Sequence, residues 1–337
     1  MGWLYYLFIF TLSYTLTWAL HRYALVTKMF DIPNARSSHV NPTPRGGGLS
    51  FVFCFLLSVF YLFSYNFINI QLAIALAGAG FLIALIGFLD DRNDVSAKWR
   101  LIGHFLVSAF AVYGLGGMPA ITVFGWTMAA GLIANMLAVF YLVWLLNLYN
   151  FMDGIDGIAA VEALTVCLGG ALLYYLSGNS SAAYLPLSLA MAVGGFLFWN
   201  FPPAKIFMGD VGSGFLGLVI GILSIQAIMV KINFFWAWLI LLGVFIVDAT
   251  VTLLLRGMRG EVLFEAHRSH AYQHASRYYG KHLPVTLGVL AINLFWLFPM
   301  AIAVGFDLIN GSLGVLIAYL PLVILALKFK GGRKESF

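Results

Sequence analysis

The sequence predicts an all-α fold, a polytopic bundle of transmembrane helices that forms one domain over residues 1–337. Two observations of composition predict it. Hydrophobic residues make up 62% of the chain and charged residues only 9%, about a third of the charged fraction of an ordinary soluble domain. Apolar runs long enough to cross a bilayer also recur from one end of the chain to the other.

Eleven apolar runs have the length of roughly 17–25 residues that a bilayer core of about 30 Å requires. The fourth run is short and the eighth is rich in glycine, so these two give the weakest signals. The first run lacks the preceding positive charges of a signal peptide, which predicts an uncleaved helix. The predicted spans are 2–20, 49–65, 70–89, 101–116, 127–146, 158–176, 182–199, 214–230, 233–254, 284–304 and 312–328.

The basic residues provide the third observation. If the eleven spans alternate in direction, all 18 Lys and Arg residues except Lys231 fall on one face. By the positive-inside rule that face is cytoplasmic, which predicts an outside N-terminus and a cytoplasmic C-terminus. The net charge of +5 is then a topology signal and gives no reason to expect a nucleic-acid partner. The cytoplasmic connections contain Arg22, Lys28, Arg36, Arg45, Arg92, Lys98, Arg100, Lys205, Arg256, Arg259, Arg268, Arg277, Lys281, Lys328, Lys330, Arg333 and Lys334.

Acidic and amide side chains gather at the same face. Asp90 and Asp91 begin an acidic stretch that ends at Asp94, where adjacent negative charges disfavour the negative end of a helix dipole. A solvated helix end is the alternative, but a cation or a phosphate-bound metal would offset the charge. The run at 147–157 is Asn-Leu-Tyr-Asn-Phe-Met-Asp-Gly-Ile-Asp-Gly. Two amides and two carboxylates at membrane depth are costly unless they meet a ligand or line a wet cavity.

Two further cytoplasmic connections carry polar side chains. Asp210 lies beside glycines that open the next helix, which suits a metal ligand next to free N–H groups, although such a stretch is also a common turn. The longest connection runs from Arg256 to Leu283 and holds five Lys or Arg and four histidines, among them His267. It could bind anionic lipid. A zinc site is disfavoured because no Cys or third ligand has a recognisable spacing, and a positive loop that faces acidic loops fits a pyrophosphate.

Five features, taken in order, resemble the polyprenyl-phosphate N-acetylhexosamine-1-phosphate transferase family. They are Pro-Thr-Pro-Arg-Gly-Gly-Gly at 42–48, Asp90-Asp91, the run at 147–157, Phe-Met-Gly-Asp at 207–210, and Asp248 with the basic loop. Bacterial members of this family include undecaprenyl-phosphate GlcNAc-1-phosphate transferases and the phospho-MurNAc-pentapeptide translocase. The run at 147–157 is the most specific of the five features.

The resemblance implies ten or eleven helices, an N-terminus in the periplasm, and a cytoplasmic-face cleft that binds a UDP-sugar and Mg²⁺ (or Mn²⁺). It implies metal ligation by Asn150 and Asp210. It implies catalytic roles for Asp90, Asp91, Asp156 and His270. It implies substrate contacts for Thr43, Arg45, Asn147, Asp153, Asn200 and Arg268. The Asp90/Asp91 pair could act as a base, hold the lipid phosphate or bind a second metal. A base has little proton to remove, because a phosphomonoester with a second pKa of about 6 is mostly a dianion at pH 7.

The implied reaction transfers N-acetylhexosamine-1-phosphate from a UDP-sugar to undecaprenyl phosphate and releases UMP. It would occur in the bacterial cytoplasmic (inner) membrane, as the first membrane step of O-antigen, lipopolysaccharide or related envelope polysaccharide synthesis. Many relatives carry His-x-His-His where this chain has His270-Ala-Tyr-Gln. This variant looks like the O-antigen or capsule branch and argues against a MurNAc-pentapeptide substrate. The sugar (GlcNAc, FucNAc, QuiNAc or another) and the oligomeric state, monomer or homodimer, stay open.

A polytopic transporter with an anion or metal site at its cytoplasmic face is the alternative from another class. Transporters usually keep their ionisable residues near the bilayer midplane. Here those residues cluster at the ends of spans on one face, and Asp248 comes nearest to a buried carboxylate. The distribution therefore favours an enzyme.

Overall fold

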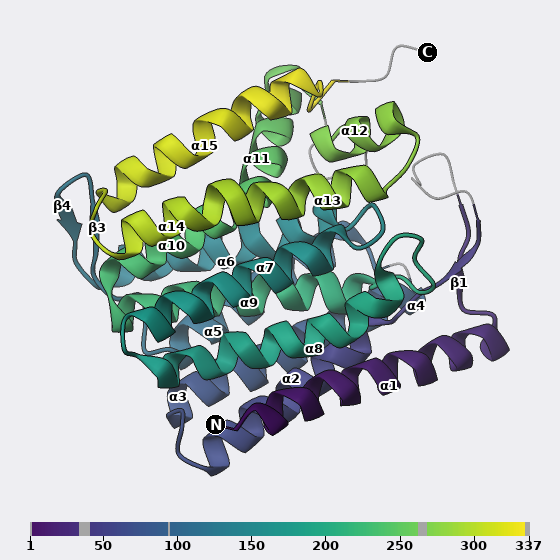
Figure 1. Ribbon diagram of the computed structural model, residues 1–337, viewed down its shortest axis with the longest axis horizontal. Coiled ribbons are helices and arrows are strands. Elements are labelled where there is room, and N and C mark those ends of the chain that lie inside the picture. Colours follow the sequence, from purple (N-terminus) through teal and green to yellow (C-terminus); the bar gives the residue numbers. More distant parts are fainter. Residues whose placement is uncertain (1, 34–40, 94, 262–267, 334–337) are drawn as a thin grey trace.

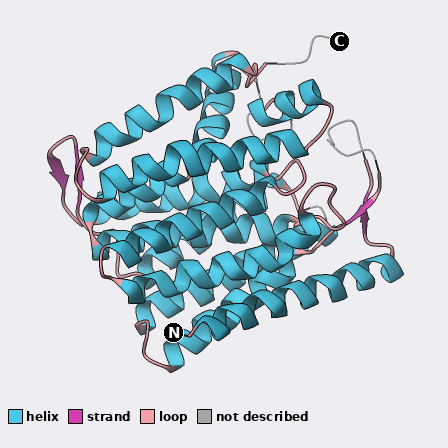
Figure 2. Ribbon diagram, in the orientation of Figure 1, coloured by secondary structure: helices cyan, strands magenta, loops and turns pink. Residues whose placement is uncertain are grey.

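The computed structural model describes residues 2–33, 41–93, 95–261 and 268–333. Within these ranges nearly all secondary structure is helical, and most helices lie roughly side by side in one bundle (Figures 1 and 2). The predicted all-α fold is therefore confirmed. Four residues named above lie outside the described ranges: Arg36, Asp94, His267 and Lys334.

The helices of the first half are α1 (Trp3–Thr27), α2 (Gly48–Ser64), α3 (Ile70–Ala73), α4 (Ala79–Asn93), α5 (Ala97–Gly114), α6 (Leu132–Met152) and α7 (Ile158–Leu176). Those of the second half are α8 (Tyr184–Asn200), α9 (Asp210–Val230), α10 (Ile232–Leu241), α11 (Gly243–Met258), α12 (Ala271–Tyr279), α13 (Leu283–Ile292), α14 (Phe298–Gly305) and α15 (Gly311–Lys328). Two π-helical segments, η1 (Ile74–Gly78) and η3 (Asn293–Leu297), join α3 to α4 and α13 to α14, and a 3-10 turn, η2 (Ser180–Ala183), precedes α8.

Each of the eleven predicted runs contains helix. Eight described segments are long and apolar enough to cross a membrane, and the bent pair α10–α11 would make a ninth. The remaining two predicted runs correspond to α2 and α5, which fall outside that group. The chain is thus a polytopic helical membrane protein. The exact number of crossings and their direction stay predictions, although α1 begins at one end of the bundle and α15 ends at the other (Figure 1).

Two predicted spans differ from the structure by more than a shift of one end, as when α1 continues to Thr27, past the predicted end at 20. Residues 127–131 of the fifth lie outside helix, because β3 (Ile121–Val123) and β4 (Trp126–Met128) form an antiparallel hairpin. Its turn residues Phe124 and Gly125 have φ of 47° and 85°, as a two-residue hairpin turn requires. The helix then continues to Met152, six residues past the predicted end at 146. The ninth predicted span is broken, since α10 and α11 meet at an angle of 68°.

Helix α9 lies at the centre of the bundle and packs against α2, α4, α6 and α10. Glycines allow the closest approach. A Cβ atom at Gly217 would lie 2.7 Å from the Cα of Leu146 on α6, and one at Gly48 would lie 2.6 Å from the Cα of Gly212. Real side chains do not approach so closely, so only glycine permits these contacts. They hold the start of α9 beside the end of α6 and the start of α2.

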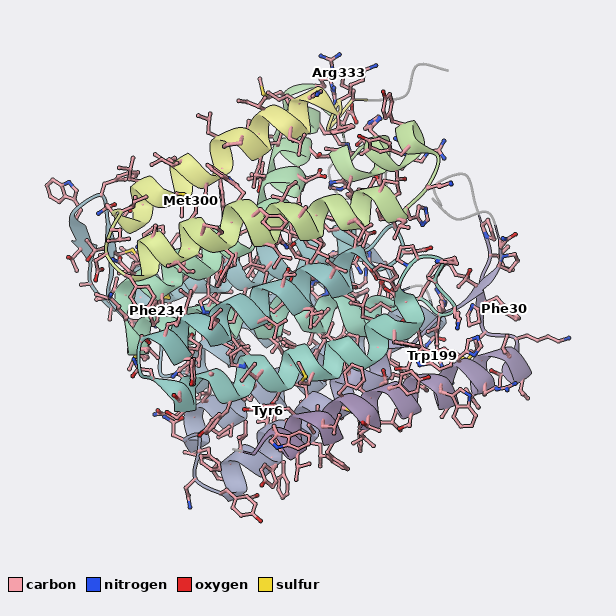
Figure 3. All side chains as sticks on the ribbon, viewed as in Figure 1. Tyr6, Phe30, Trp199, Phe234, Met300 and Arg333 are labelled. Atoms are coloured by element: carbon pink, nitrogen blue, oxygen red, sulfur yellow. The ribbon has the colours of Figure 1, made fainter. Side chains whose placement is uncertain are left out.

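The one basic residue predicted on the opposite face is paired. Lys231 Nζ lies 2.5 Å from Asp307 Oδ2 and donates to the Gly305 carbonyl over 2.8 Å. Figure 3 shows the neighbouring Phe234 at the end of the bundle opposite Arg333. An ion pair lowers the cost of a cation at that end, so Lys231 does not contradict the charge pattern.

Candidate active site

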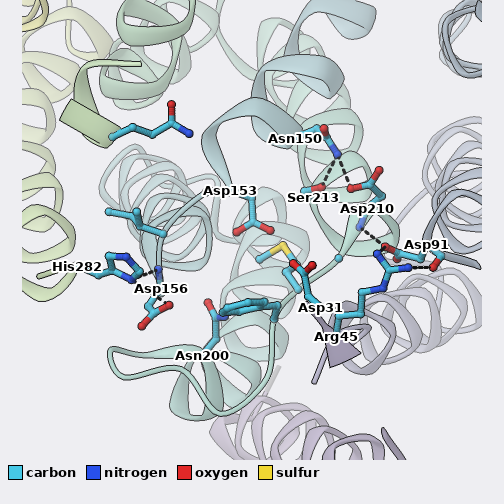
Figure 4. Close-up of a pocket in the computed structure, with 16 residues that line it drawn as sticks. Asp31, Arg45, Asp91, Asn150, Asp153, Asp156, Asn200, Asp210, Ser213 and His282 are labelled. Carbon is cyan, nitrogen blue, oxygen red and sulfur yellow. Dashed lines mark hydrogen bonds and ion pairs between the residues drawn. The ribbon is translucent and has the colours of Figure 1, made fainter. Parts of the chain in front are cut away.

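A cavity of about 210 Å³ opens at the end of the bundle where α4 and α6 end and α7 and α9 begin (Figure 4). We call it the polar cavity. Seven residues predicted from sequence line it: Arg45, Asp91, Asn150, Asp153, Asp156, Asn200 and Asp210. Four polar side chains that the sequence analysis did not assign to the site also line it: Asp31, Ser213, Gln273 and His282.

The two predicted metal ligands meet in this cavity. Asn150, on the last turns of α6, donates its Nδ2 to Asp210 Oδ1 over 2.8 Å and to Ser213 Oγ over 3.2 Å. Asp210 is the first residue of α9. Residues 60 positions apart therefore form one polar group, because α6 and α9 pack along their length.

The carboxylate of Asp91 accepts hydrogen bonds from the first backbone N–H groups of α9. Its Oδ1 accepts the N–H of Asp210 over 3.2 Å, and its Oδ2 accepts the N–H of Val211 over 3.3 Å. A carboxylate is favourable there because a helix begins with free N–H groups and a positive dipole end. Gly87 makes room for this contact, since a Cβ atom at that position would lie 2.6 Å from the Asp210 carbonyl carbon. Asp91 thus positions α9 as well as lining the cavity.

Asp90 pairs with Arg100, a residue that the sequence analysis counted only as a topology signal. Nη1 of Arg100 donates to Asp90 Oδ2 and, over 3.1 Å, to Asp210 Oδ2. The side chain of Asp90 is 8% exposed and that of Arg100 33%. Arg100 is on α5, so its proximity to α9 depends on how the two helices pack. In the sequence, Arg100 lies just before an apolar run and belongs to no motif, so the sequence did not indicate a role in the site.

Asp90 and Arg100 also line a second cavity of about 90 Å³, which we call the amphipathic cavity. Asn150 and Asp210 line both cavities. The predicted substrate residue Asn147 lies here and not in the polar cavity; its Nδ2 donates to the Val143 carbonyl of its own helix over 2.7 Å. The rest of the wall is mainly apolar and includes Ile83, Ile86, Leu101, Leu146 and Phe151.

Arg45 reaches the site through backbone pairing of its loop. The N–H of Phe207 donates to the Pro44 carbonyl over 2.8 Å, and the N–H of Gly47 donates to the Phe207 carbonyl over 2.9 Å. Arg45 Nη2 then donates to the Asp91 carbonyl oxygen. Thr43 lies in the short strand pair β1 (Phe30–Asp31) and β2 (Thr43–Pro44), where its hydroxyl donates to the Asn41 carbonyl over 3.1 Å. Thr43 is not among the residues that line the polar cavity.

Asp156 and Asn200 form the opposite wall. His282 Nδ1 lies 3.1 Å from Asp156 Oδ1, and Asp156 Oδ2 accepts the N–H of Ala204 over 3.1 Å. Asn200 is 2% exposed. Its Oδ1 accepts the N–H of Gly157 over 3.1 Å, and its Nδ2 donates to the Ile206 carbonyl over 3.0 Å. The amide of Asn200 therefore links the loop before α7 to the loop before α9. This is a structural contact, whereas the resemblance implied a contact with substrate.

Asp153 directly follows α6, and its side chain lies between the two walls (Figure 4). Burial raises its pKa well above the usual value, and the neighbouring carboxylates Asp210, Asp91 and Asp156 raise it further. Like charges this close disfavour one another's ionised forms. A cation in the cavity would relieve that repulsion.

The structure places His270 and Arg268 differently from the prediction. His270 is 1% exposed, its Nδ1 lies 3.3 Å from Asp248 Oδ1, and it does not line the polar cavity. Asp248 also accepts the N–H groups of Ala271 and Tyr272 over 2.9 Å each. Together, Asp248 and His270 fix the start of α12, and the role of His270 at a pyrophosphate stays a prediction. Arg268 is absent from the polar cavity wall.

The donor chemistry fits a hard divalent cation. No group of three or more His, Cys, Asp or Glu among the described residues could hold a metal ion by itself. Mg²⁺ does not need such a cage, because it is usually bound through one or two carboxylates together with substrate phosphates. The amide of Asn150 and the carboxylate of Asp210 provide oxygen ligands of the right kind in an excess of negative charge.

Comparison with known proteins gives consistent matches. The family Glycosyl transferase family 4 matches residues 71–228. A probable undecaprenyl-phosphate N-acetylglucosaminyl 1-phosphate transferase of Bacillus subtilis (strain 168) is 32% identical over 260 residues, which are 74% of this chain and 70% of the relative. A phospho-N-acetylmuramoyl-pentapeptide-transferase of Streptococcus thermophilus is 30% identical over 229 residues, 64% of this chain and 66% of the relative. The corresponding transferase of Moorella thermoacetica is 33% identical over 198 residues, 55% and 61% of the two chains. The chain thus spans somewhat less than two thirds of several curated relatives.

Proposed function

Because this chain belongs to glycosyl transferase family 4, we propose that it transfers N-acetylhexosamine-1-phosphate from a UDP-sugar to undecaprenyl phosphate and releases UMP. The products would be undecaprenyl-diphosphate-sugar and UMP. The proposed location is the bacterial inner membrane, and the proposed role is to start O-antigen or a related envelope polysaccharide. The match to the Bacillus relative and the polar site at the end of the bundle support this reading.

One observation carries the proposal: the polar and amphipathic cavities share Asn150 and Asp210. A UDP-sugar is polar throughout and charged at its diphosphate, which suits the first cavity. A polyprenyl phosphate has a charged head on an apolar chain, which suits the second, where Arg100 stands at one end of a mainly apolar wall. The acceptor phosphate and the diphosphate of the donor would then meet beside Asp210.

In the proposed reaction an oxygen of the acceptor phosphate forms a bond to the sugar-proximal phosphorus of the donor. The bond from that phosphorus to the bridging oxygen breaks, and UMP leaves with the electron pair. Mg²⁺ (or Mn²⁺), held by Asn150 and Asp210 when bound, would offset the charge on the diphosphate.

The chain's own residues would orient the two substrates. Arg100 would bind the acceptor phosphate through its guanidinium, and Arg45 would face the donor diphosphate from the other side. Asp91 would keep the start of α9 and hence Asp210 in place. Asp90, paired with Arg100, would aim the guanidinium. This gives the Asp90/Asp91 pair a positioning role and assigns no proton transfer to it.

Release of UMP tests the proposal. Purified protein in neutral detergent should release UMP from a UDP-HexNAc only when undecaprenyl phosphate and Mg²⁺ are both present. A panel of donors with one lipid acceptor would identify the sugar. Absence of UMP with every donor would refute the transferase, and release without the lipid would indicate a hydrolase instead. Uptake of a UDP-sugar into proteoliposomes without UMP release would support the transporter.

A further inference from the structure

Gln273 lies on the wall of the polar cavity but has no role in the reaction described above. It is the third residue of α12 and is 5% exposed. Its Oε1 accepts the N–H of His270 over 3.2 Å, and together they form a capping box at the start of the helix. The amide oxygen of Gln273 therefore caps α12, and its NH₂ group is left for other contacts.

The capping contact fixes the orientation of the amide. A backbone N–H can be met only by the amide oxygen, so the NH₂ group must occupy the other side. That side faces the segment between Asp153 and Asp156: a Cβ atom at Gly154 would lie 3.2 Å from Gln273 Nε2. It would also overlap the hydroxyl of Tyr272, whose hydroxyl donates to the Phe151 carbonyl over 2.9 Å. Gly154 thus leaves space that Tyr272 and Gln273 fill.

This part of the cavity is remote from its cationic side. Figure 4 shows Asp156 and His282 across the cavity from Arg45 and Asp91. The NH₂ group of Gln273 adds a neutral donor near Gly154, where its printed neighbour is the hydroxyl of Tyr272. An amide NH₂ carries two hydrogens, so a contact to that hydroxyl leaves the second one for a ligand. A neutral donor suits an uncharged oxygen, such as a carbonyl or a hydroxyl, better than it suits a phosphate, which would prefer a cation.

We propose that Gln273 recognises the nucleotide-sugar by donating a hydrogen bond from Nε2 to an uncharged oxygen of that molecule. This inference rests on the proposed function, since it takes the polar cavity as the donor site. The oxygen belongs either to the sugar or to the uracil base. Both offer the same chemistry, and a ligand without the sugar distinguishes them.

Two substitutions separate recognition from capping. Gln273→Glu keeps an oxygen for the N–H of His270, so α12 stays capped, but it removes the NH₂ donor and adds a charge. Gln273→Met has a similar length and no charge, and it removes both the capping acceptor and the donor. The thermal midpoint should therefore fall in Gln273→Met and stay close to the unsubstituted value in Gln273→Glu.

The dissociation constants of UDP-GlcNAc and of UMP, measured by calorimetry in detergent with Mg²⁺, give the second readout. Loss of one neutral hydrogen bond weakens binding by about threefold to tenfold. We expect both variants to bind UDP-GlcNAc more weakly by about this factor. Unchanged UMP binding in Gln273→Met would assign the oxygen to the sugar, and an equal loss for UMP would assign it to the base.

If charge repulsion were the only effect, Gln273→Glu would bind both UDP-GlcNAc and UMP more weakly, and Gln273→Met would bind both of them normally. That result, or unchanged UDP-GlcNAc binding in both variants, would overturn the inference and leave Gln273 as a helix cap. Because binding is measured, the inference can fail while UMP release by the unsubstituted protein still supports the transferase. It can also stand if UMP release fails but UDP-GlcNAc binds.

Discussion

The carboxylate of Asp248 lies 3.3 Å from the Nδ1 of His270, 22 residues further along the chain, and both side chains are buried. The same carboxylate receives the first two N–H groups of α12. Asp248 on α11 therefore anchors the helix that carries Gln273 to the cavity. This relationship connects the bend between α10 and α11 with the geometry of the site.

Replacing Asp248 should loosen α12. Asp248→Ala removes the acceptor for two buried N–H groups, and we expect a loss of about 1–3 kcal/mol in stability. Asp248→Asn retains one oxygen and should lose less. Thermal unfolding in detergent measures the effect, and UDP-GlcNAc affinity should fall in the same order. Thr252→Val is the matched control, because it removes only the hydroxyl that donates to Asp248 over 3.2 Å. Equal stability in all three variants would contradict the anchoring role.

Removing the metal ligand should abolish turnover without preventing insertion. Activity should need Mg²⁺ or Mn²⁺ and stop on chelation. Asp210→Asn should lower the rate by at least about 10²-fold, by analogy with the loss of other electrostatic contacts to a transition state. UMP release measured against Mg²⁺ concentration checks this. Full activity of the purified variant at limiting Mg²⁺ would rule out Asp210 as a ligand.

Arg100 should affect the lipid substrate more than the nucleotide-sugar. Arg100→Met removes the guanidinium that donates to Asp90 and Asp210, so the KM for undecaprenyl phosphate should rise and the rate should fall. Arg100→Lys should recover only part of the loss, since a point charge cannot replace a fork of donors. Lys98→Met, two residues earlier on the same helix, is the control for net charge. An identical effect at both positions would mean that Arg100 acts only through charge.

Asp153 should make stability depend on pH. Its raised pKa means that the native state keeps a proton which the unfolded state loses above about pH 4. The unfolding free energy should therefore fall as pH rises above that value, by up to about 1.4 kcal/mol per pH unit from this group. Asp153→Asn does not titrate at this position. The difference in unfolding free energy between this variant and the unsubstituted protein should therefore shift in favour of the variant as pH rises from 4 to 8. Thermal midpoints in chelator at several pH values test this, and parallel curves would contradict it.

The membrane topology is open to a direct test. A reporter that is active only outside the membrane should be silent when fused at Asn93, Asp153 or Arg268 and active at Ser180 or Asn310. This expectation follows from the segregation of basic residues, with Lys231 neutralised by Asp307. Activity at Arg268 would place the basic loop outside and would exclude a cytoplasmic site there.

The sequence alone determined the class of the protein and the positions of its helices. Hydrophobicity is a local property of the chain, so eleven apolar runs located eleven helical regions. The polar run at 147–157 contains Asn150, Asp153 and Asp156, which line the polar cavity. The hairpin near Trp126 and the break near Leu242 were missed. Each lies inside an apolar stretch, where composition does not distinguish a turn or a bend from a straight span.

Only the tertiary structure decided what each polar side chain touches. Asp90 and Asp91 are neighbours in sequence, yet one pairs with Arg100 on α5 and the other receives the first N–H groups of α9. His270 turned inward to Asp248, while Gln273, at a position where many relatives carry a histidine, and His282 reached the cavity. These differences arise because hydrogen-bond partners are set by helix packing, and contacts such as Gly87 against Asp210 depend on residues far apart in the chain.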